Sequence, residues 1–207
     1  SHEAFEEEAE ARTRTEWWAE ARGILWLVVA VLGFHSLIAK PFYIPSESMM
    51  PGLLKGDRLV VSKYPYGWSY SSVSFHLAPK IAGRLFGKLP ERGDIVVLEH
   101  PVTRIDYIKR VIGVPGDKIT YENKRLTVNG KEVQYTPLDD YLDDESTVYH
   151  KQLEENLTGV SHRILNDEPA PTLNLREVKD FPHKEACNYN EDGFTCVVPA
   201  GNYFMMG

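Results

Sequence analysis

Residues 106–117 read DYIKRVIGVPGD, and this stretch decides the fold of the chain. Its first part is a β-branched run of strand length, and Pro115-Gly116-Asp117 is a turn signal that ends the run. Asn129-Gly130 is a strong hairpin turn signal between two further runs. Short runs of the same kind, separated by Gly, Pro and Asp, occupy residues 58–62, 94–99, 118–121, 125–128 and 196–198. The pattern predicts a mainly β domain.

Lys109 lies inside the predicted strand, on a face that it shares with Ile105, Tyr107 and Val111. A lysine on an apolar face either extends its ammonium group to water or loses its proton. A neutral lysine can act as a general base if burial lowers its pKa from about 10.4 towards 7–8. Taken alone, the pattern is typical of a strand lysine that reaches water, so it does not establish a base.

Residues 44–51 read IPSESMMP and place Ser46 and Ser48 between two prolines. Proline fixes its own φ angle and restricts the preceding residue, so we expect a stiff, extended segment. A stiff segment can hold a hydroxyl group in one place, as a nucleophile requires, although a serine also needs a base. A connector with two solvated serines would have the same spacing.

Residues 23–39 read GILWLVVAVLGFHSLIA and contain no charged side chain. As a helix this run would be about 25 Å long, slightly less than the hydrocarbon core of a bilayer. Tryptophans 17, 18 and 26 lie near one end and Phe42 and Tyr43 at the other, as in interfacial aromatic belts. We predict a transmembrane anchor over 23–40, preceded by a polar tail over 1–22. A buried core helix and a cleaved signal peptide are the alternatives.

The chain has 207 residues, of which 43% are hydrophobic and 26% charged, as in ordinary globular proteins. Its net charge of -7 argues against nucleic acid as a partner. The charge is uneven: the first 22 residues are acidic, the middle is basic, and residues 139–186 are acidic again. We predict a β domain in two parts, 41–136 and 187–207, interrupted by a polar, acidic insertion over 137–186.

The two cysteines, Cys187 and Cys196, are either free thiols or a disulfide that closes a short loop. The sequence contains no metal-binding Cys/His spacing, no H-E-x-x-H motif and no phosphate-binding glycine loop. None of the seven histidines lies in a sequence context typical of a catalytic triad. If Ser48 and Lys109 act together as nucleophile and base, the pair needs neither a metal nor an organic cofactor, and we expect none.

Taken in order, these motifs resemble bacterial type I signal peptidase, a membrane-bound serine protease. The resemblance rests on Ser-x-Ser-Met-x-Pro at 46–51, Gly-Asp with an apolar run at 56–61, Arg-Gly-Asp-Ile-Val-Val at 92–97, the lysine box at 106–117, and residues 201–207. It implies that Ser48 is the nucleophile and that Lys109 is the general base. It also implies that the Ser46 hydroxyl and the Ser48 amide form the oxyanion hole.

The family resemblance further implies shallow pockets for small residues at positions -1 and -3 of the signal peptide, lined by Phe42, Ile44, Leu53, Tyr107 and Ile108. It implies a signal-peptidase-like β domain with a single membrane anchor in the bacterial inner membrane, and with its catalytic part on the periplasmic side. The expected partners are preprotein signal peptides, the lipid bilayer and the neighbouring export translocon.

The family continues beyond Gly207 with Asp-Asn-Arg-Asp-x-Ser, whose side chains support the lysine. Without these residues we expect the general base to be poorly oriented and residues 1–207 alone to be weakly active or inactive. Two other functions share these residues. One is a self-cleaving Ser/Lys protease, which the membrane run disfavours, and the other is a tethered β module that binds exported chains without cutting them. A serine-directed reagent that blocks Ser48 would separate these two.

Overall fold

The computed structural model describes residues 2–62, 65–66, 87–100, 103–166 and 171–207. The chain divides into two compact units, one made of Ser1–Phe42 and Val60–Leu89 and the other of Tyr43–Leu59 and Pro90–Gly207. The three residues predicted to carry chemistry, Ser46, Ser48 and Lys109, all belong to the second unit.

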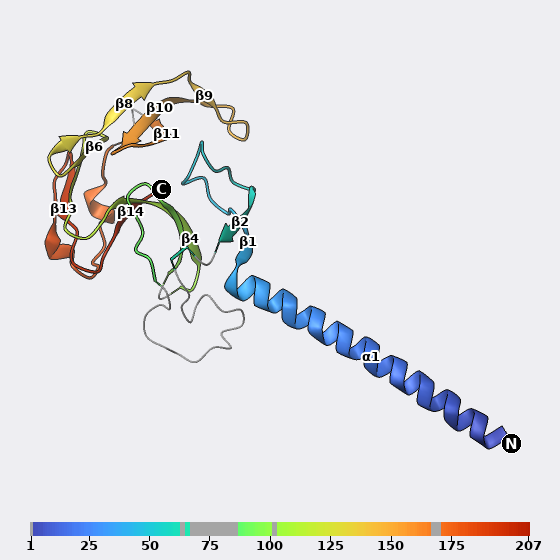
Figure 1. Ribbon diagram of the computed structural model, residues 1–207. Coiled ribbons are helices and arrows are strands. Elements are labelled where there is room, and N and C mark those ends of the chain that lie inside the picture. The colour runs from blue at the N-terminus through green and yellow to red at the C-terminus, as the bar shows by residue number, and fades with distance from the viewer. Residues whose placement is uncertain (1, 63–64, 67–86, 101–102, 167–170) are drawn as a thin grey trace. The chain divides into compact units, whose positions relative to one another are not determined.

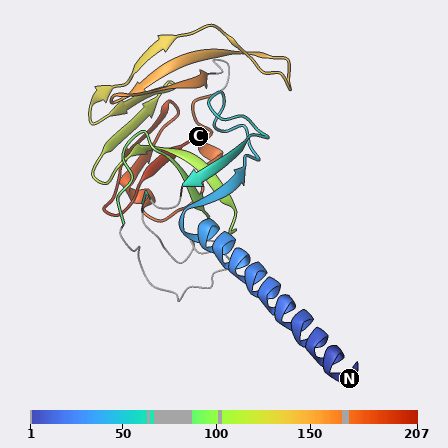
Figure 2. The same cartoon turned by 45° about the vertical axis from the view of Figure 1, so that its right-hand side comes forward.

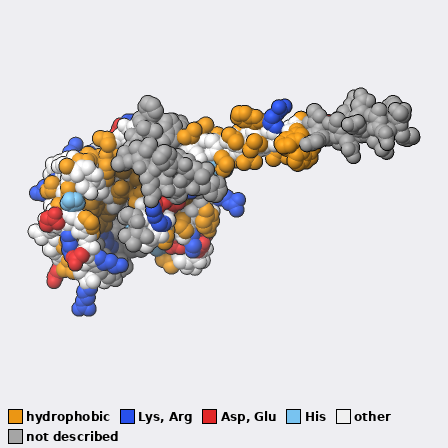
Figure 3. All heavy atoms as spheres, turned by 90° about the horizontal axis from the view of Figure 1, so that it is seen from below, with side chains coloured by type: hydrophobic (Ala, Val, Ile, Leu, Met, Phe, Trp, Pro, Cys, Tyr) orange, Lys and Arg blue, Asp and Glu red, His pale blue; other side chains and the backbone are white. Residues whose placement is uncertain are grey.

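The first unit contains α1 (His2–Leu37), a continuous helix of 36 residues. Its portion Glu16–Leu37 is 22 residues long and apolar enough to cross a membrane, and no residue of its apolar 18-residue window is buried within the structure. Figure 3 shows hydrophobic side chains along the described part of this helix. The chain leaves the helix just before Pro41, because the residue before a proline is biased towards extended conformations. Ala39–Tyr43 then forms β1, which pairs with β2 (Arg58–Ser62).

Three sheets make up the β structure of the described residues of the second unit, and Figures 1 and 2 show how their strands run. The first has the strand order β14-β4-β3, with β3 at Ile95–Glu99, β4 at Asp106–Gly113 and β14 at Phe204–Met206. The second has the order β12-β13-β5-β6-β7, with these strands at Cys187–Tyr189, Gly193–Val197, Lys118–Glu122, Arg125–Val128 and Lys131–Glu132. All pairs are antiparallel. β4 is therefore a central strand, with β3 on one side and β14 on the other.

The third sheet has the order β11-β10-β8, with β9 paired to β10. It lies mostly in the predicted insertion, but its strand β8 begins before residue 137. Its strands are β8 (Gln134–Pro137), β9 (Tyr141–Leu142), β10 (Tyr149–Leu157) and β11 (Val160–Asn166), and two short 3-10 helices follow at Leu175–Glu177 and Lys184–Ala186. The sequence does not indicate β10, because two of its buried side chains, Gln152 and Glu155, are polar and lie three positions apart, on opposite faces of the strand. A long hairpin therefore occupies a segment that reads as a weakly patterned acidic insertion.

One hydrophobic core joins these sheets. Ile119 and Leu126 of the five-stranded sheet cluster with Ile112 of β4, Leu157 of β10 and Val198, and all five are at most 4% exposed. Burying each of these side chains stabilises the fold by about 1.5–3 kcal/mol. The prediction of a mainly β domain is confirmed, as are the strand runs read from the sequence and the Asn129-Gly130 hairpin.

Candidate active site

Residues 44–57 form a closed loop, called here the nucleophile loop. The amide of Ile44 donates to the carbonyl of Asp57 at 3.0 Å, and the amide of Gly56 donates back to the carbonyl of Ile44 at 2.9 Å. The Asp57 carboxylate accepts from the amide of Leu54 at 2.9 Å. Inside the loop, the amide of Leu53 donates to the carbonyl of Met49 at 3.0 Å. These bonds fix the backbone that carries both serines.

Lys109 approaches this loop from the middle of β4. Its Nζ donates to Ser48 Oγ at 2.9 Å, and Ser48 Oγ lies 3.2 Å from Ser46 Oγ. The lysine is partly buried, and this burial lowers its pKa below the ordinary value because the charged form is desolvated. A Cβ built on Gly207 would collide with the lysine side chain, so the backbone of Gly207 packs directly against the lysine stem. The structure thus brings together a hydroxyl, an amine with a lowered pKa and a second hydroxyl.

The five residues expected to line the signal-peptide pockets differ in how exposed their side chains are. Ile44 is 1% exposed and Tyr107 is 40% exposed, while Leu53 and Ile108 are partly buried. Phe42 lies in β1 in the first unit, with the Lys40 ammonium 5.1 Å from its ring centre. The structure therefore groups four of these side chains in the unit that carries Ser48, and their role in binding stays a prediction.

Asp117 links two segments that flank β3 and β4. Its carboxylate accepts from Arg92 Nη2 at 2.5 Å, from the amide of Val114 at 2.9 Å and from Asn129 Nδ2 at 2.8 Å. Burial raises the pKa of this carboxyl, but the hydrogen bonds outweigh burial and hold the pKa below its ordinary value. Arg92 also donates to Thr158 Oγ1 at 3.1 Å, in the turn between β10 and β11. One buried ion pair thus ties the hairpin of the third sheet to the turn after β4.

A second link runs from the predicted insertion to the nucleophile loop. Lys55 Nζ lies 3.3 Å from Glu145 Oε2, and 3.6 Å from Oε1 of Glu47, which stands between the two serines. The hydrogen bond and charge of Glu145, together with the charge of Glu47, raise the pKa of Lys55. These side chains are largely exposed, so we expect the link to orient the loop weakly.

Sequence reasoning missed a buried pair beneath the loop. His162 Nε2 of β11 lies 3.1 Å from Glu155 Oε1 of β10, and the two residues are direct cross-strand partners. Both side chains are almost fully buried, with 12% and 8% exposed. The charge of Glu155 also raises the pKa of Tyr121, although burial of the phenol is the larger cause. The only clue in the sequence was the set of ionisable residues within a segment that otherwise looked solvated.

Within the described part of the chain, no group of His, Cys, Asp or Glu residues could hold a metal ion. Cys187 and Cys196 are direct partners across β12 and β13, and the structure joins them by a disulfide with their Cα atoms 4.0 Å apart.

The family model for signal peptidase, peptidase S26, matches residues 15–207. Among curated proteins, the chain is 33% identical over 199 residues to signal peptidase I of Rickettsia akari, covering 94% of this chain and 68% of the relative. It is 34% identical over 200 residues to signal peptidase I of Rickettsia canadensis, with coverages of 94% and 69%. Signal peptidase I of Buchnera aphidicola is 32% identical over 212 residues, with coverages of 87% and 63%. The chain therefore belongs to the signal peptidase family, peptidase S26.

Proposed function

We propose that this protein is a serine endopeptidase that removes N-terminal signal peptides from exported preproteins, with Ser48 as nucleophile and Lys109 as general base. The observation that carries this proposal is the 2.9 Å contact between Lys109 Nζ and Ser48 Oγ, made by a lysine whose pKa is lowered by burial. A serine hydroxyl is a weak nucleophile, and a neutral amine at hydrogen-bond distance is a suitable base.

The first half of the reaction forms an acyl-enzyme. Neutral Lys109 takes the proton of the Ser48 hydroxyl, and the oxygen attacks the carbonyl carbon of the scissile peptide bond. The negative charge on the former carbonyl oxygen is stabilised by the hydroxyl of Ser46 and the amide of Ser48. The Ser46 hydroxyl, 3.2 Å from Ser48 Oγ, is close enough for this role. Protonated Lys109 then gives its proton to the leaving amine of the mature chain.

The second half releases the signal peptide. The amine has left, so a water molecule can approach the ester that links Ser48 to the last residue of the signal peptide. Lys109, neutral again, takes a proton from this water, and the hydroxide attacks the ester carbon. The same donors stabilise the second oxyanion, and Ser48 recovers its proton from the lysine. One base therefore serves both steps.

The apolar part of α1 supports a membrane-bound enzyme. Glu16–Leu37 is long and apolar enough to span a bilayer, and its aromatic side chains suit the membrane interface. The proposed topology is single-pass in the bacterial inner membrane, with the second unit on the outer side, next to the export translocon. The disulfide between Cys187 and Cys196 supports that orientation, because disulfides persist in oxidising compartments. Cleavage would then occur where the substrate leaves the bilayer.

The test uses the full-length protein in detergent with a preprotein that carries an A-x-A cleavage site. The new N-terminus of the product is read by mass spectrometry for the wild type, Ser48→Ala and Lys109→Ala. A matched control is Lys131→Ala, which removes an exposed lysine of β7. We expect cleavage directly after the second alanine by the wild type and the control alone.

Three results would change the proposal. Cleavage that survives Lys109→Ala would keep the protease and discard this lysine as the base. Absence of cleavage in the wild type, with binding of the preprotein retained, would favour a module that binds exported chains. Loss of mass from the enzyme itself, without cutting of the preprotein, would favour a self-cleaving protease.

A further inference from the structure

The turn between β10 and β11 packs against the segment that supports the strand of Lys109. A Cβ built on Gly93 would lie 2.7 Å from Val160 at the start of β11, so the backbone at Gly93 packs directly against the hairpin. The amide of Gly93 donates to the carbonyl of Val111 of β4 at 2.8 Å, and the amide of Val111 donates to the carbonyl of Asp94 at 2.8 Å. The hairpin is therefore linked to β4 two residues from Lys109.

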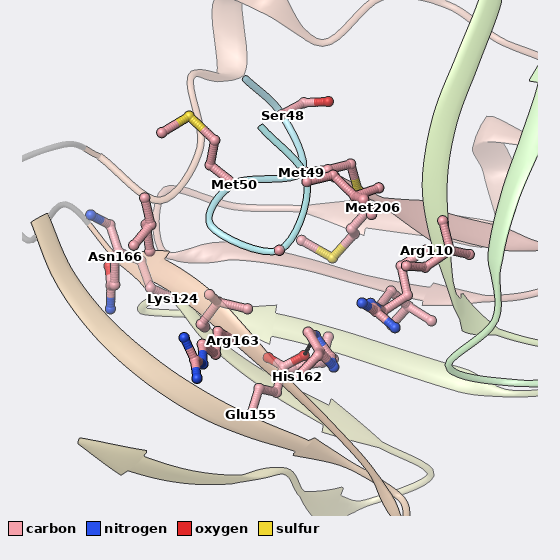
Figure 4. Close-up of a pocket in the computed structure, with 18 of the residues that line it drawn as sticks. Ser48, Met49, Met50, Arg110, Lys124, Glu155, His162, Arg163, Asn166 and Met206 are labelled. Carbon is pink, nitrogen blue, oxygen red and sulfur yellow. Dashed lines mark ion pairs between the residues drawn. The ribbon is translucent and has the colours of Figure 1, made fainter. Parts of the chain in front are cut away.

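The turn at the other end of β10 reaches the loop that carries Ser48. Glu145 lies in this turn, called here the β9–β10 turn (residues 143–148), and its Oε2 accepts from Lys55 Nζ at 3.3 Å. The same ammonium lies 3.6 Å from Oε1 of Glu47, the residue between the two serines. Figure 4 shows the loop and the hairpin facing each other across a cavity, with Ser48 on the loop and His162 on the hairpin. Lys55 therefore joins the two sides.

The β9–β10 turn is fixed by its own hydrogen bonds. The amide of Asp143 donates to the carbonyl of Val148 at 3.0 Å, and the amide of Thr147 donates to the carbonyl of Asp143 at 2.7 Å. The Asp143 carboxylate accepts from the amides of Glu145 and Ser146 at 3.1 and 3.3 Å. Because the backbone at Glu145 is already ordered, less conformational entropy is lost when its side chain pairs with the loop.

β10 thus carries, at its two ends, a contact to the strand of the proposed base and a contact to the loop of the proposed nucleophile. The strand has nine residues and spans about 30 Å. Proton transfer from Ser48 to Lys109 requires that the two atoms stay at hydrogen-bond distance. A small misplacement of a reacting group lowers the rate of the chemical step without a change in substrate contacts.

We propose that Lys55 is a positioning residue, which holds the Ser48 hydroxyl in place for proton transfer to Lys109. Its ion pairs with Glu145 and Glu47 attach the nucleophile loop to the β9–β10 turn, and β10 fixes this turn relative to β4. The proposal rests on the function proposed above. It gives the third sheet a part in the reaction, although that sheet supplies neither the nucleophile nor the base.

The first measurement is cleavage of a preprotein by the full-length protein in detergent. Lys55→Gln and Glu145→Gln should each lower kcat about two- to fivefold with KM unchanged, as for the loss of an exposed ion pair. The double variant should be no slower than Lys55→Gln, because both changes break the same link. Lys55→Arg keeps the charge and should keep most of kcat. The matched control is Glu132→Gln, which breaks an ion pair whose carboxylate is 58% exposed, against 65% for Glu145.

The dependence of kcat on salt separates this link from a packing defect. Salt screens exposed charges, with a Debye length of about 3 Å at 1 M. The ratio of kcat between the wild type and Glu145→Gln should therefore fall towards one as the salt concentration rises to about 1 M. A ratio that does not change with salt would exclude the ion pair as its cause.

Hydrogen exchange tests the positioning without a substrate. The amides of Leu53 and Gly56 are bonded within the nucleophile loop and exchange when the loop opens. They should exchange about two- to fivefold faster in Glu145→Gln than in the wild type, and at the wild-type rate in Glu132→Gln. Equal exchange in the wild type and Glu145→Gln would overturn the proposal, whether or not any preprotein is cut.

Failure of this proposal and of the proposed function can be told apart. Cleavage by the wild type, and its loss in Ser48→Ala, reports on the function alone. An unchanged kcat in Lys55→Gln would refute the positioning role. A raised KM with kcat unchanged would refute it too, because that result assigns Lys55 to substrate binding. If no preprotein is cut but the loop exchanges faster in Glu145→Gln, the proposed function fails and the link between loop and turn is supported.

Discussion

The ion pair between Arg92 and Asp117 offers a sharp test of how the second unit is held together. Asp117 is 7% exposed and accepts hydrogen bonds from Arg92, Asn129 and the amide of Val114. Replacing it by Ala removes all three acceptor contacts and leaves the Arg92 guanidinium, whose side chain is 20% exposed, without its counter-charge. Arg92 retains its bond to Thr158.

Removing one partner of a buried ion pair costs about 3–5 kcal/mol, and the partial exposure of Arg92 places Asp117→Ala near about 3 kcal/mol. Asp117→Asn keeps the shape and one acceptor oxygen, so we expect a loss of about 1–2 kcal/mol. Asp180→Ala is the control, because its ion pair with Lys184 involves a carboxylate that is 97% exposed. We expect that control to leave stability unchanged.

The assay is urea unfolding of the full-length protein in detergent, followed by the β-sheet signal in circular dichroism between pH 3 and 7. The pKa of Asp117 is lowered in the folded state, so the folded protein binds fewer protons than the unfolded chain between the two pKa values. Asp117 therefore contributes fully to the free energy of unfolding above its pKa in the unfolded chain, about 4, and this contribution is lost as the pH falls through its pKa in the folded protein. The wild type and Asp117→Asn should therefore converge in stability towards pH 3. A gap that stays constant with pH, or an Asp117→Ala loss no larger than that of the control, would refute this reasoning.

Three further predictions concern catalysis and the core. The rate of cleavage should rise with pH through the lowered pKa of Lys109, with the slope expected for the loss of one proton. Lys109→Arg should be inactive, because arginine stays charged. A Lys109→Arg variant with the pH–rate profile of the wild type would exclude Lys109 as the base. Ser46→Ala should lower kcat about 10²–10³-fold with little change in KM, as expected for an oxyanion donor, and Ser46→Thr should restore much of the rate. Leu157→Ala should destabilise the whole second unit by about 2–5 kcal/mol in urea unfolding, because Leu157 is fully buried in the core that the sheets share. A separate unfolding transition at lower urea, confined to the β10–β11 hairpin, would show instead that this hairpin folds on its own.

The sequence predicted the parts of this molecule that depend on local chemistry. The β-branched runs and the Asn129-Gly130 turn indicated their strands because each pattern is set within a few residues. The pairing of Ser48 with Lys109 came from the family resemblance, since neither spacing alone implied a contact. Nothing in the sequence placed Arg92 beside Asp117, because that contact depends on how the turn after β4 packs on the segment before β3.

The buried pair of Glu155 and His162 was missed for a related reason. The two residues are seven positions apart, and only the register of β10 against β11 makes them neighbours. Polar residues at buried positions break the hydrophobic pattern that identifies a strand, so the buried Glu155 and His162 themselves concealed the hairpin in the sequence. The residue pattern of a sequence does not predict contacts that depend on strand register and on packing between sheets.

β4 positions the lysine of the candidate active site. Successive residues of a strand point to opposite faces, so Lys109 reaches Ser48 while its neighbour Arg110 lines the cavity and donates to the carbonyl of Gly93 at 2.7 Å. The next residue, Val111, is fully buried, which fixes the strand in register. A shift of β4 by one residue would turn Lys109 to the other face of the sheet, away from Ser48. The proposed catalytic step therefore depends on the register of this one strand.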